Sequence, residues 1–305
     1  MKKLILLCVI ILCSGTGWAS DPRVVVSIKP IHSLVVGVMQ GVAEPQLLVK
    51  GGGSPHGYVL RPSEARALAS ADLIVWVGPN LESFLEKSLG TLGREAEKLQ
   101  LLDALKEQLL PARKGGNWET HQHERDHQAG EHQALALNPH LWLSPKLAKQ
   151  VVAVTAAAVS RIDPDRQAVY RQNAERLLQK LDELDRRLAA KLAPVKEVPY
   201  LVFHDAYQYF EAAYGLNAVG SVTIDPERKP GIKRLLEMRE KIKRLNARCV
   251  FSEPQFEPKL VATIIEGTGA SRGELDPLGA QLPAGQESYF QLMEQLANDL
   301  LAGMR

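Results

Sequence analysis

The chain is poor in cysteine and carries almost no net charge. Two of its three cysteines, Cys8 and Cys13, fall in an N-terminal segment that we expect to be removed. The remaining Cys249 then has no partner, which excludes an intramolecular disulfide and predicts a small buried side chain. The formal charge of +2 falls to 0 when Lys2 and Lys3 are also removed. This balance gives no electrostatic basis for binding nucleic acid or an anionic membrane.

The sequence also lacks an apolar run long enough to span a bilayer, for which about 20 residues are needed. Residues 4–12 form a shorter apolar run behind the two N-terminal lysines, and Gly17 and Ala19 have the small-x-small spacing of a signal peptidase site. We therefore predict a cleaved signal peptide over residues 1–19 and export of the mature chain. A lipid anchor at Cys13 is the alternative, but Leu12 occupies the position where a lipobox has a small residue.

What the sequence does contain is a regular alternation of short β-branched runs and amphipathic helical patterns, in two sets. The expected strands of the first set are residues 23–28, 45–50, 72–78 and 98–103. Those of the second set are residues 200–204, 218–224, 249–253 and 272–276. Such alternation is typical of parallel sheets covered by helices.

Between the two sets, a helical pattern runs from Asp163 to about Ala193 and is ended by Pro194. Its apolar stripe consists of Leu177, Leu178, Leu181, Leu184 and Leu188. We predict an α/β fold with two Rossmann-like lobes joined by one long helix, and a chain long enough for two cores. The N-terminal lobe is residues 20–162, the linking helix 163–194 and the C-terminal lobe 195–305. A polar stretch without apolar periodicity, residues 113–133, is expected to be a histidine-rich loop in the first lobe.

That loop contains the run HQHERDHQAGEH and the most conspicuous group of histidines, namely His121, His123, His127 and His132. Irregularly spaced histidines in a loop can bind metal, but ordering the loop costs about 1–2 kcal/mol per residue. We therefore expect a secondary, low-affinity metal site that collects cations. The alternative is a solvated linker whose histidines are incidental.

Four less conspicuous residues follow predicted strands or lie in ordered loops, two from each lobe: His56, His140, His204 and Asp276. Ligands of open α/β sheets bind beyond the carboxyl ends of the strands, so these side chains could meet in a cleft between the lobes. Three imidazoles and one carboxylate suit a borderline divalent ion such as Zn²⁺. A single histidine after a strand is more often a turn or core residue, so only the convergence of several favours a metal site.

Several ordered motifs resemble one family closely: GGGSPHGYVLRPSEARALASADLIVWVGPNLESFLEK, NPHLWLSP, FHDAYQYFEAAYGL, FSEPQF and GELDPLG. Together they are similar to the zinc-uptake substrate-binding proteins of bacterial ABC transporters, over nearly all of the mature chain. The resemblance implies two lobes joined by a long helix, with zinc held between them by His56, His140 and His204. Some relatives have a glutamate before the first histidine, where this chain has Pro55, which leaves Asp276 or water as the fourth ligand.

The resemblance also implies a periplasmic protein, acting as a monomer, that delivers Zn²⁺ to an inner-membrane ABC permease with a cytoplasmic ATPase and catalyses no reaction. Glu253 is the candidate outer partner of a zinc-bound imidazole, and the alternative is a carboxylate at the start of a helix before PQFEP. Related manganese binders have a carboxylate where this chain has His204, so manganese is the alternative ion. A secreted zinc hydrolase and an adhesin are the alternatives from other classes, although no HExxH motif is present.

Overall fold

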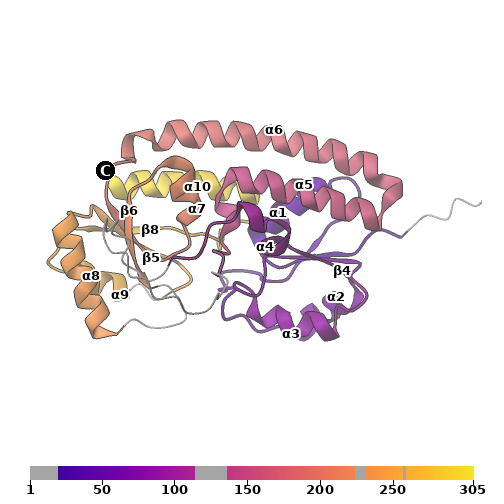
Figure 1. Cartoon of the computed structure of the whole chain (residues 1–305), viewed down its shortest axis with the longest axis horizontal. Helices are drawn as coiled ribbons and strands as arrows, with labels where there is room; N and C mark the ends of the chain where they lie inside the picture. Colours follow the sequence, from indigo (N-terminus) through magenta and orange to yellow (C-terminus); the bar gives the residue numbers. More distant parts are fainter. Residues whose placement is uncertain (1–19, 114–135, 224–230, 257–258) are drawn as a thin grey trace, which may run out of the picture.

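Two parallel sheets form the frame of the molecule (Figure 1). The computed structural model describes residues 20–113, 136–223, 231–256 and 259–305. Within these residues each sheet has four strands, and every strand pairing is parallel. Parallel strands need long crossover connections, which most often contain a helix. The α/β class predicted from the alternating pattern is therefore confirmed.

The first sheet has the strand order β2-β1-β3-β4. Its strands are β1 (Val24–Val26), β2 (Gln46–Leu47), β3 (Leu73–Trp76) and β4 (Glu97–Gln100). Its helices are α1 (Lys29–Val38), α2 (Pro62–Ser70), α3 (Ser83–Thr91), α4 (Leu101–Ala104) and α5 (Pro145–Ile162). The expected strand 98–103 is thus wrong in its second half, where the chain turns into α4. Val24 and Val26 pack on one apolar cluster and Val25 on another, because successive strand side chains point to opposite faces.

The second sheet has the order β6-β5-β7-β8. Its strands are β5 (Tyr200–His204), β6 (Ala218–Thr223), β7 (Cys249–Ser252) and β8 (Ser271–Glu274). Its helices are α7 (Gln208–Tyr214), α8 (Ile232–Leu245), α9 (Lys259–Ile265) and α10 (Ser288–Met304). Cys249 is buried and free, as its lack of a partner predicted.

The long helix α6 (Gln167–Leu192) runs along the top of Figure 1 and covers both lobes. Its 26 residues give a length of about 39 Å. It is shorter than the expected 163–194 because residues 164–166 and 193–195 form 3₁₀ turns at the two prolines. Its buried stripe includes four of the five predicted leucines, Leu178 being only partly buried: Leu177, Leu181, Leu184 and Leu188.

The main apolar core is shared by the two lobes. One cluster contains residues of both sheets and of α1, α5, α6 and α10. Helix α10, from the end of the chain, packs on α1 of the first lobe as well as on α6. A smaller cluster lies on the outer face of each sheet, under α2 and α3 in one lobe and under α8 and α9 in the other. The expectation of two separate cores is therefore incomplete, since the largest core joins the lobes.

Among the described residues, no helix combines the length and the apolar content needed to cross a membrane. The longest, α6, is charged along its outer face and includes ion pairs to α10 through Arg187 and Lys191.

We expect Leu184→Ala to lower the free energy of unfolding by about 2–5 kcal/mol, because it leaves a cavity in the shared core. Leu184 is fully buried, whereas Leu236 on α8 is 55% exposed. The control Leu236→Ala should change stability by less than about 0.5 kcal/mol. Chemical denaturation followed by circular dichroism measures both, and equal effects of the two changes would contradict a core that α6 shares with both lobes.

Candidate metal centre

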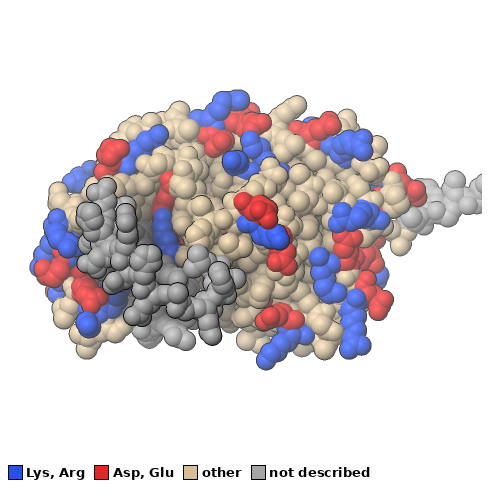
Figure 2. Space-filling view, in the orientation of Figure 1, with Lys and Arg blue, Asp and Glu red and all other residues tan. Residues whose placement is uncertain are grey.

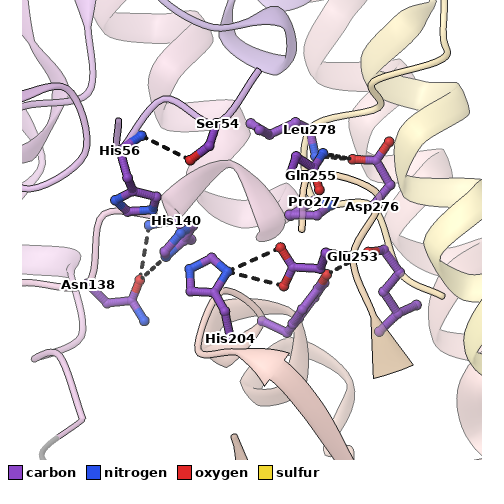
Figure 3. Close-up of polar contacts among 12 residues, drawn as sticks. Ser54, His56, Asn138, His140, His204, Glu253, Gln255, Asp276, Pro277 and Leu278 are labelled. Atoms are coloured by element: carbon purple, nitrogen blue, oxygen red, sulfur yellow. Dashed lines mark hydrogen bonds and ion pairs between the residues drawn. The ribbon is translucent and has the colours of Figure 1, made fainter. Parts of the chain in front are cut away.

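Three histidines from different segments face one another between the lobes (Figure 3). His56 lies in the loop between β2 and α2, and His140 immediately precedes a 3₁₀ turn at Leu141–Leu143. His204 is the last residue of β5. The first two belong to the first lobe and the third to the second. They meet because the carboxyl ends of strands in both sheets point into the same cleft.

The geometry of the cluster is compact. The ring centroids are 5.7 Å apart for His56 and His140, 5.5 Å for His56 and His204, and 4.8 Å for His140 and His204. One nitrogen from each ring lies within 4.8 Å of the other two. Across the part of the chain that the structure describes, no other group of three or more His, Cys, Asp or Glu side chains has this arrangement.

Two of the three imidazoles are held neutral by their surroundings. Burial, followed by the proximity of His204, lowers the pKa of His56 to about 3. Burial, followed by the proximity of His204 and His56, also holds the pKa of His140 well below its usual range. The Nε2 atoms of His56 and His204 are buried without a hydrogen-bond partner among the described residues. Neutral rings with unused Nε2 lone pairs are what a divalent cation requires of its ligands.

Two neighbouring side chains fix which ring nitrogen faces the centre. The Nδ1–H of His204 donates to both carboxylate oxygens of Glu253, at 3.1 and 3.2 Å. The Nδ1–H of His140 donates to Oδ1 of Asn138 at 2.9 Å, and the same oxygen accepts the backbone N–H of His140 at 3.0 Å. An acceptor on Nδ1 leaves Nε2 as the free ligand atom.

Glu253, which the sequence offered as an outer partner, lies beside the imidazole of His204. Asn138 was missed, although the sequence carries a signal for it. It lies two residues before His140 in the NPH motif, and Asn side chains commonly bond to the backbone two residues on. Its amide also reaches the other lobe, where Nδ2 donates to Oε1 of Gln208 at 2.8 Å.

Asp276 is not brought into the cluster. Its Oδ1 accepts the backbone N–H groups of Leu278 and Gly279, both at 3.0 Å, and Nε2 of Gln255 at 2.7 Å. Its Oδ2 accepts the N–H of Ala280 at 2.5 Å. In Figure 3 the carboxylate points toward this loop and away from the imidazoles. Both oxygens thus hold a turn together rather than face a cation.

The space at the histidines is small at its inner end and open at its outer end. A cavity of about 10 Å³ borders all three rings, together with Glu253 and Gln255. It has room for about one water molecule or one ion. On the outer side, a pocket of about 520 Å³ leads from solvent to the same three rings. The inner cavity therefore fits a single cation, which can reach it through the outer pocket.

Trp142 is fully buried and forms part of the 3₁₀ turn that follows His140. The 3₁₀ turn places its ring 5.3 Å from that of His140, centroid to centroid, and its Nε1–H donates to the carbonyl oxygen of Pro277 in the second lobe at 2.8 Å. The ring thus packs one wall of the cluster and ties it to the loop that Asp276 holds.

The histidine-rich run, with His121, His123, His127 and His132, lies outside the described residues. The segments on either side of it are described and lie at the wall of the outer pocket. There, Pro111 and Leu137 form an antiparallel bridge, and the N–H of Ala112 donates to the carbonyl oxygen of Ala136 at 2.7 Å. The described residues that flank positions 114–135 therefore lie beside the pocket that leads to the three histidines.

Comparison with known proteins agrees with this geometry. Residues 24–303 match the family described as Zinc-uptake complex component A, periplasmic. The high-affinity zinc uptake system protein ZnuA of Brucella abortus (strain 2308) is 47% identical, with 94% of this chain and 93% of that protein covered. The protein of the same name from Yersinia pestis is 33% identical, with 100% of this chain and 98% of that protein covered.

The fold has close counterparts among solved structures. A crystal structure of ZnuA superposes with a TM-score of 0.78 at 24% identity, covering 93% of this chain and all of that one. The periplasmic zinc-binding protein TroA of Treponema pallidum has the same TM-score at 22% identity, covering 93% of this chain and 99% of that one. With the family match over residues 24–303, the chain belongs to the family of periplasmic component A proteins of zinc-uptake complexes.

Proposed function

We propose that the protein is a periplasmic, high-affinity zinc-binding protein that captures Zn²⁺ and delivers it to an inner-membrane ABC permease with a cytoplasmic ATPase. The observation that carries this proposal is the meeting of three imidazoles, drawn from both lobes, in a space sized for one ion. The relatives named as high-affinity zinc uptake proteins support it. Export through the signal peptide at residues 1–19 belongs to the same proposal.

The protein ligands of the cation are His56, His140 and His204, each through Nε2. Water completes the coordination, because the oxygens of Asp276, which the sequence offered as the fourth ligand, are engaged by the 278–280 backbone and Gln255. Imidazole nitrogen favours Zn²⁺ over Mn²⁺, for which oxygen ligands are preferred. An all-imidazole set therefore supports zinc over the manganese alternative.

The protein binds and releases its ion without chemistry. A zinc hydrolase needs a general base beside the metal-bound water and space for substrate. Glu253, a buried carboxylate beside the rings, is engaged through both oxygens by His204, and Asp205 at the outer pocket is paired with Arg113, so both nearby carboxylates are already engaged. On the face in Figure 2, Lys and Arg are interspersed with Asp and Glu, which gives no basis for nucleic acid as a partner. We propose a monomer that docks on the permease.

The histidine-rich run of residues 113–133 is proposed to collect zinc at lower affinity beside the outer pocket. The position of its two flanks supports this, because a cation released there would be close to the path toward the three rings.

We expect His56→Ala, His140→Ala and His204→Ala each to abolish tight zinc binding, since each removes one of three ligands. Asp276→Asn should have a far smaller effect, because the amide oxygen can still accept hydrogen bonds from the loop. His32→Ala is the matched control, since His32 is buried, bonds Pro45 and stands outside the cluster. Competition with a chromophoric zinc chelator measures the affinities, and a tight site that survives all three histidine changes would overturn the ligand assignment.

Asn138→Leu and Glu253→Gln test the outer partners. Each should weaken zinc binding by about 10–100-fold, the usual cost of losing such a partner. Glu253→Gln retains an acceptor and so should lie at the lower end of that range. The same competition titration applies, with the melting temperature as a control for folding. An affinity equal to that of the wild type in both variants would show that these contacts do not orient the rings.

Deleting residues 117–133 should leave one tight zinc site per molecule and remove weaker sites, because the three ligands lie outside that segment. Isothermal titration calorimetry counts both classes of site. Loss of the tight site on deletion would reverse the proposed ranking of loop and cleft.

A further inference from the structure

Three carboxylates lie in or near the walls of the metal pocket, although none is assigned to the cation. Asp205 and Glu253 line it, and Asp276 lies behind the lining residues Pro277 and Leu278. Carboxylate oxygen is the ligand that Mn²⁺ prefers, so the selectivity of the centre depends on where these oxygens are held. The contacts of each carboxylate therefore decide which cation the pocket suits.

Two of the three carboxylates accept hydrogen bonds through both of their oxygens. Glu253 is buried and engaged through both oxygens by His204. Asp276 accepts three backbone N–H groups and one amide of Gln255. These contacts explain why neither carboxylate is available to a cation.

Asp205 is held differently. It follows His204 directly, and it lines the same outer pocket as the three histidines. Its side chain is only 6% exposed, and its Oδ1 accepts a hydrogen bond from Nη1 of Arg113 at 3.0 Å. Arg113 comes from the other lobe and is itself 23% exposed, so within the described part of the chain this carboxylate is restrained by a side chain at the edge of the pocket.

Further contacts hold the Arg113 side chain beside Asp205. Its Nη2 donates to Oε2 of Glu211 on α7 at 2.5 Å, so the two arms of the guanidinium bridge two buried carboxylates. Nearby, the hydroxyl of Tyr209 accepts the N–H of Leu110 and donates to the carbonyl oxygen of Asn138. These contacts fasten the backbone that precedes Arg113 to the second lobe and so limit the movement of its side chain.

We propose that Arg113 is a specificity-determining residue that holds the Asp205 carboxylate away from the cation and so keeps the protein ligands all imidazole. This inference rests on the proposed function, since it concerns the ion that the same centre selects. When Arg113 is removed, Asp205 becomes an oxygen ligand or a partner of the metal-bound water, and the pocket accepts Mn²⁺ more readily. Loss of a positive charge alone would favour both divalent ions together, so the ratio of the two affinities identifies ligation.

The experiment compares the full-length mature protein with Arg113→Gln, Asp205→Asn and the double variant. Zn²⁺ affinity is measured by chelator competition and Mn²⁺ affinity from the electron paramagnetic resonance signal of the free ion. In Arg113→Gln we expect the ratio of the Mn²⁺ to the Zn²⁺ dissociation constant to fall by about tenfold or more, because a hard cation gains an oxygen ligand. In the double variant the ratio should return to the wild-type value.

Arg187→Gln is the matched control, because Arg187 also pairs with two carboxylates, Glu183 and Glu294, and does not line the pocket. It should leave the ratio unchanged. Arg113→Lys keeps the charge but loses the forked contact, so its ratio should lie between those of the wild type and Arg113→Gln. Arg113→Lys also gives a second measurement of this ratio if Arg113→Gln has a much lower melting temperature than the wild type.

An unchanged ratio in Arg113→Gln overturns the inference, as does an equal loss of affinity for both ions, which would mark Arg113 as a purely structural contact. A gain for Mn²⁺ that persists in the double variant also overturns it, because Asp205 would then not be the ligand. If instead the proposed function is wrong, the wild type itself will show no tight zinc site.

Discussion

The metal centre depends on the apolar core that joins the two lobes. Helix α6 lies across both sheets, and α10 returns from the second lobe to pack on α1 of the first. This shared core fixes the carboxyl ends of both sheets toward one another, which is the condition for His204 to meet His56 and His140. Because burial of apolar surface is the dominant favourable term in folding, the relative position of the ligands is set by the same interaction that stabilises the chain.

Polar contacts between the lobes then hold the walls of the pocket in place. The loop after β8 is held from two sides, since Asp276 accepts its N–H groups and Nζ of Lys29 donates to the carbonyl oxygens of Gly279, Ala280 and Leu282. Burial lowers the pKa of Lys29, while the nearby Asp276 raises it. The contact joins α1 of the first lobe to a loop of the second, and a buried charge with several hydrogen bonds of this kind resists separation.

Within the pocket, metal recognition follows from which groups are left unengaged. Burial keeps His56 and His140 neutral, and Asn138 and Glu253 turn the Nε2 atoms of His140 and His204 inward. The surrounding carboxylates are occupied by backbone N–H groups, by an imidazole or by Arg113. The chemistry offered to a cation is thus mainly nitrogen, although oxygen ligands lie in the walls. Orientation, rather than the residue types present, gives the site its preference.

The sequence by itself determined the α/β class, most strands to within two or three residues, the long helix and the three histidines. These follow from local rules: β-branched runs make buried strands, apolar spacing makes helices, and polar residues at strand ends face a ligand. Strand 98–103 was wrong in its second half because an apolar run can continue into a helix when the sheet ends, as it does at α4. Only the tertiary structure decided the rest. The direction of the Asp276 carboxylate, the role of Asn138 and the pairing of Arg113 with Asp205 depend on groups distant in sequence or on the local fold of a loop. These orientations and pairings are set by packing between the lobes, and no local sequence pattern predicts them.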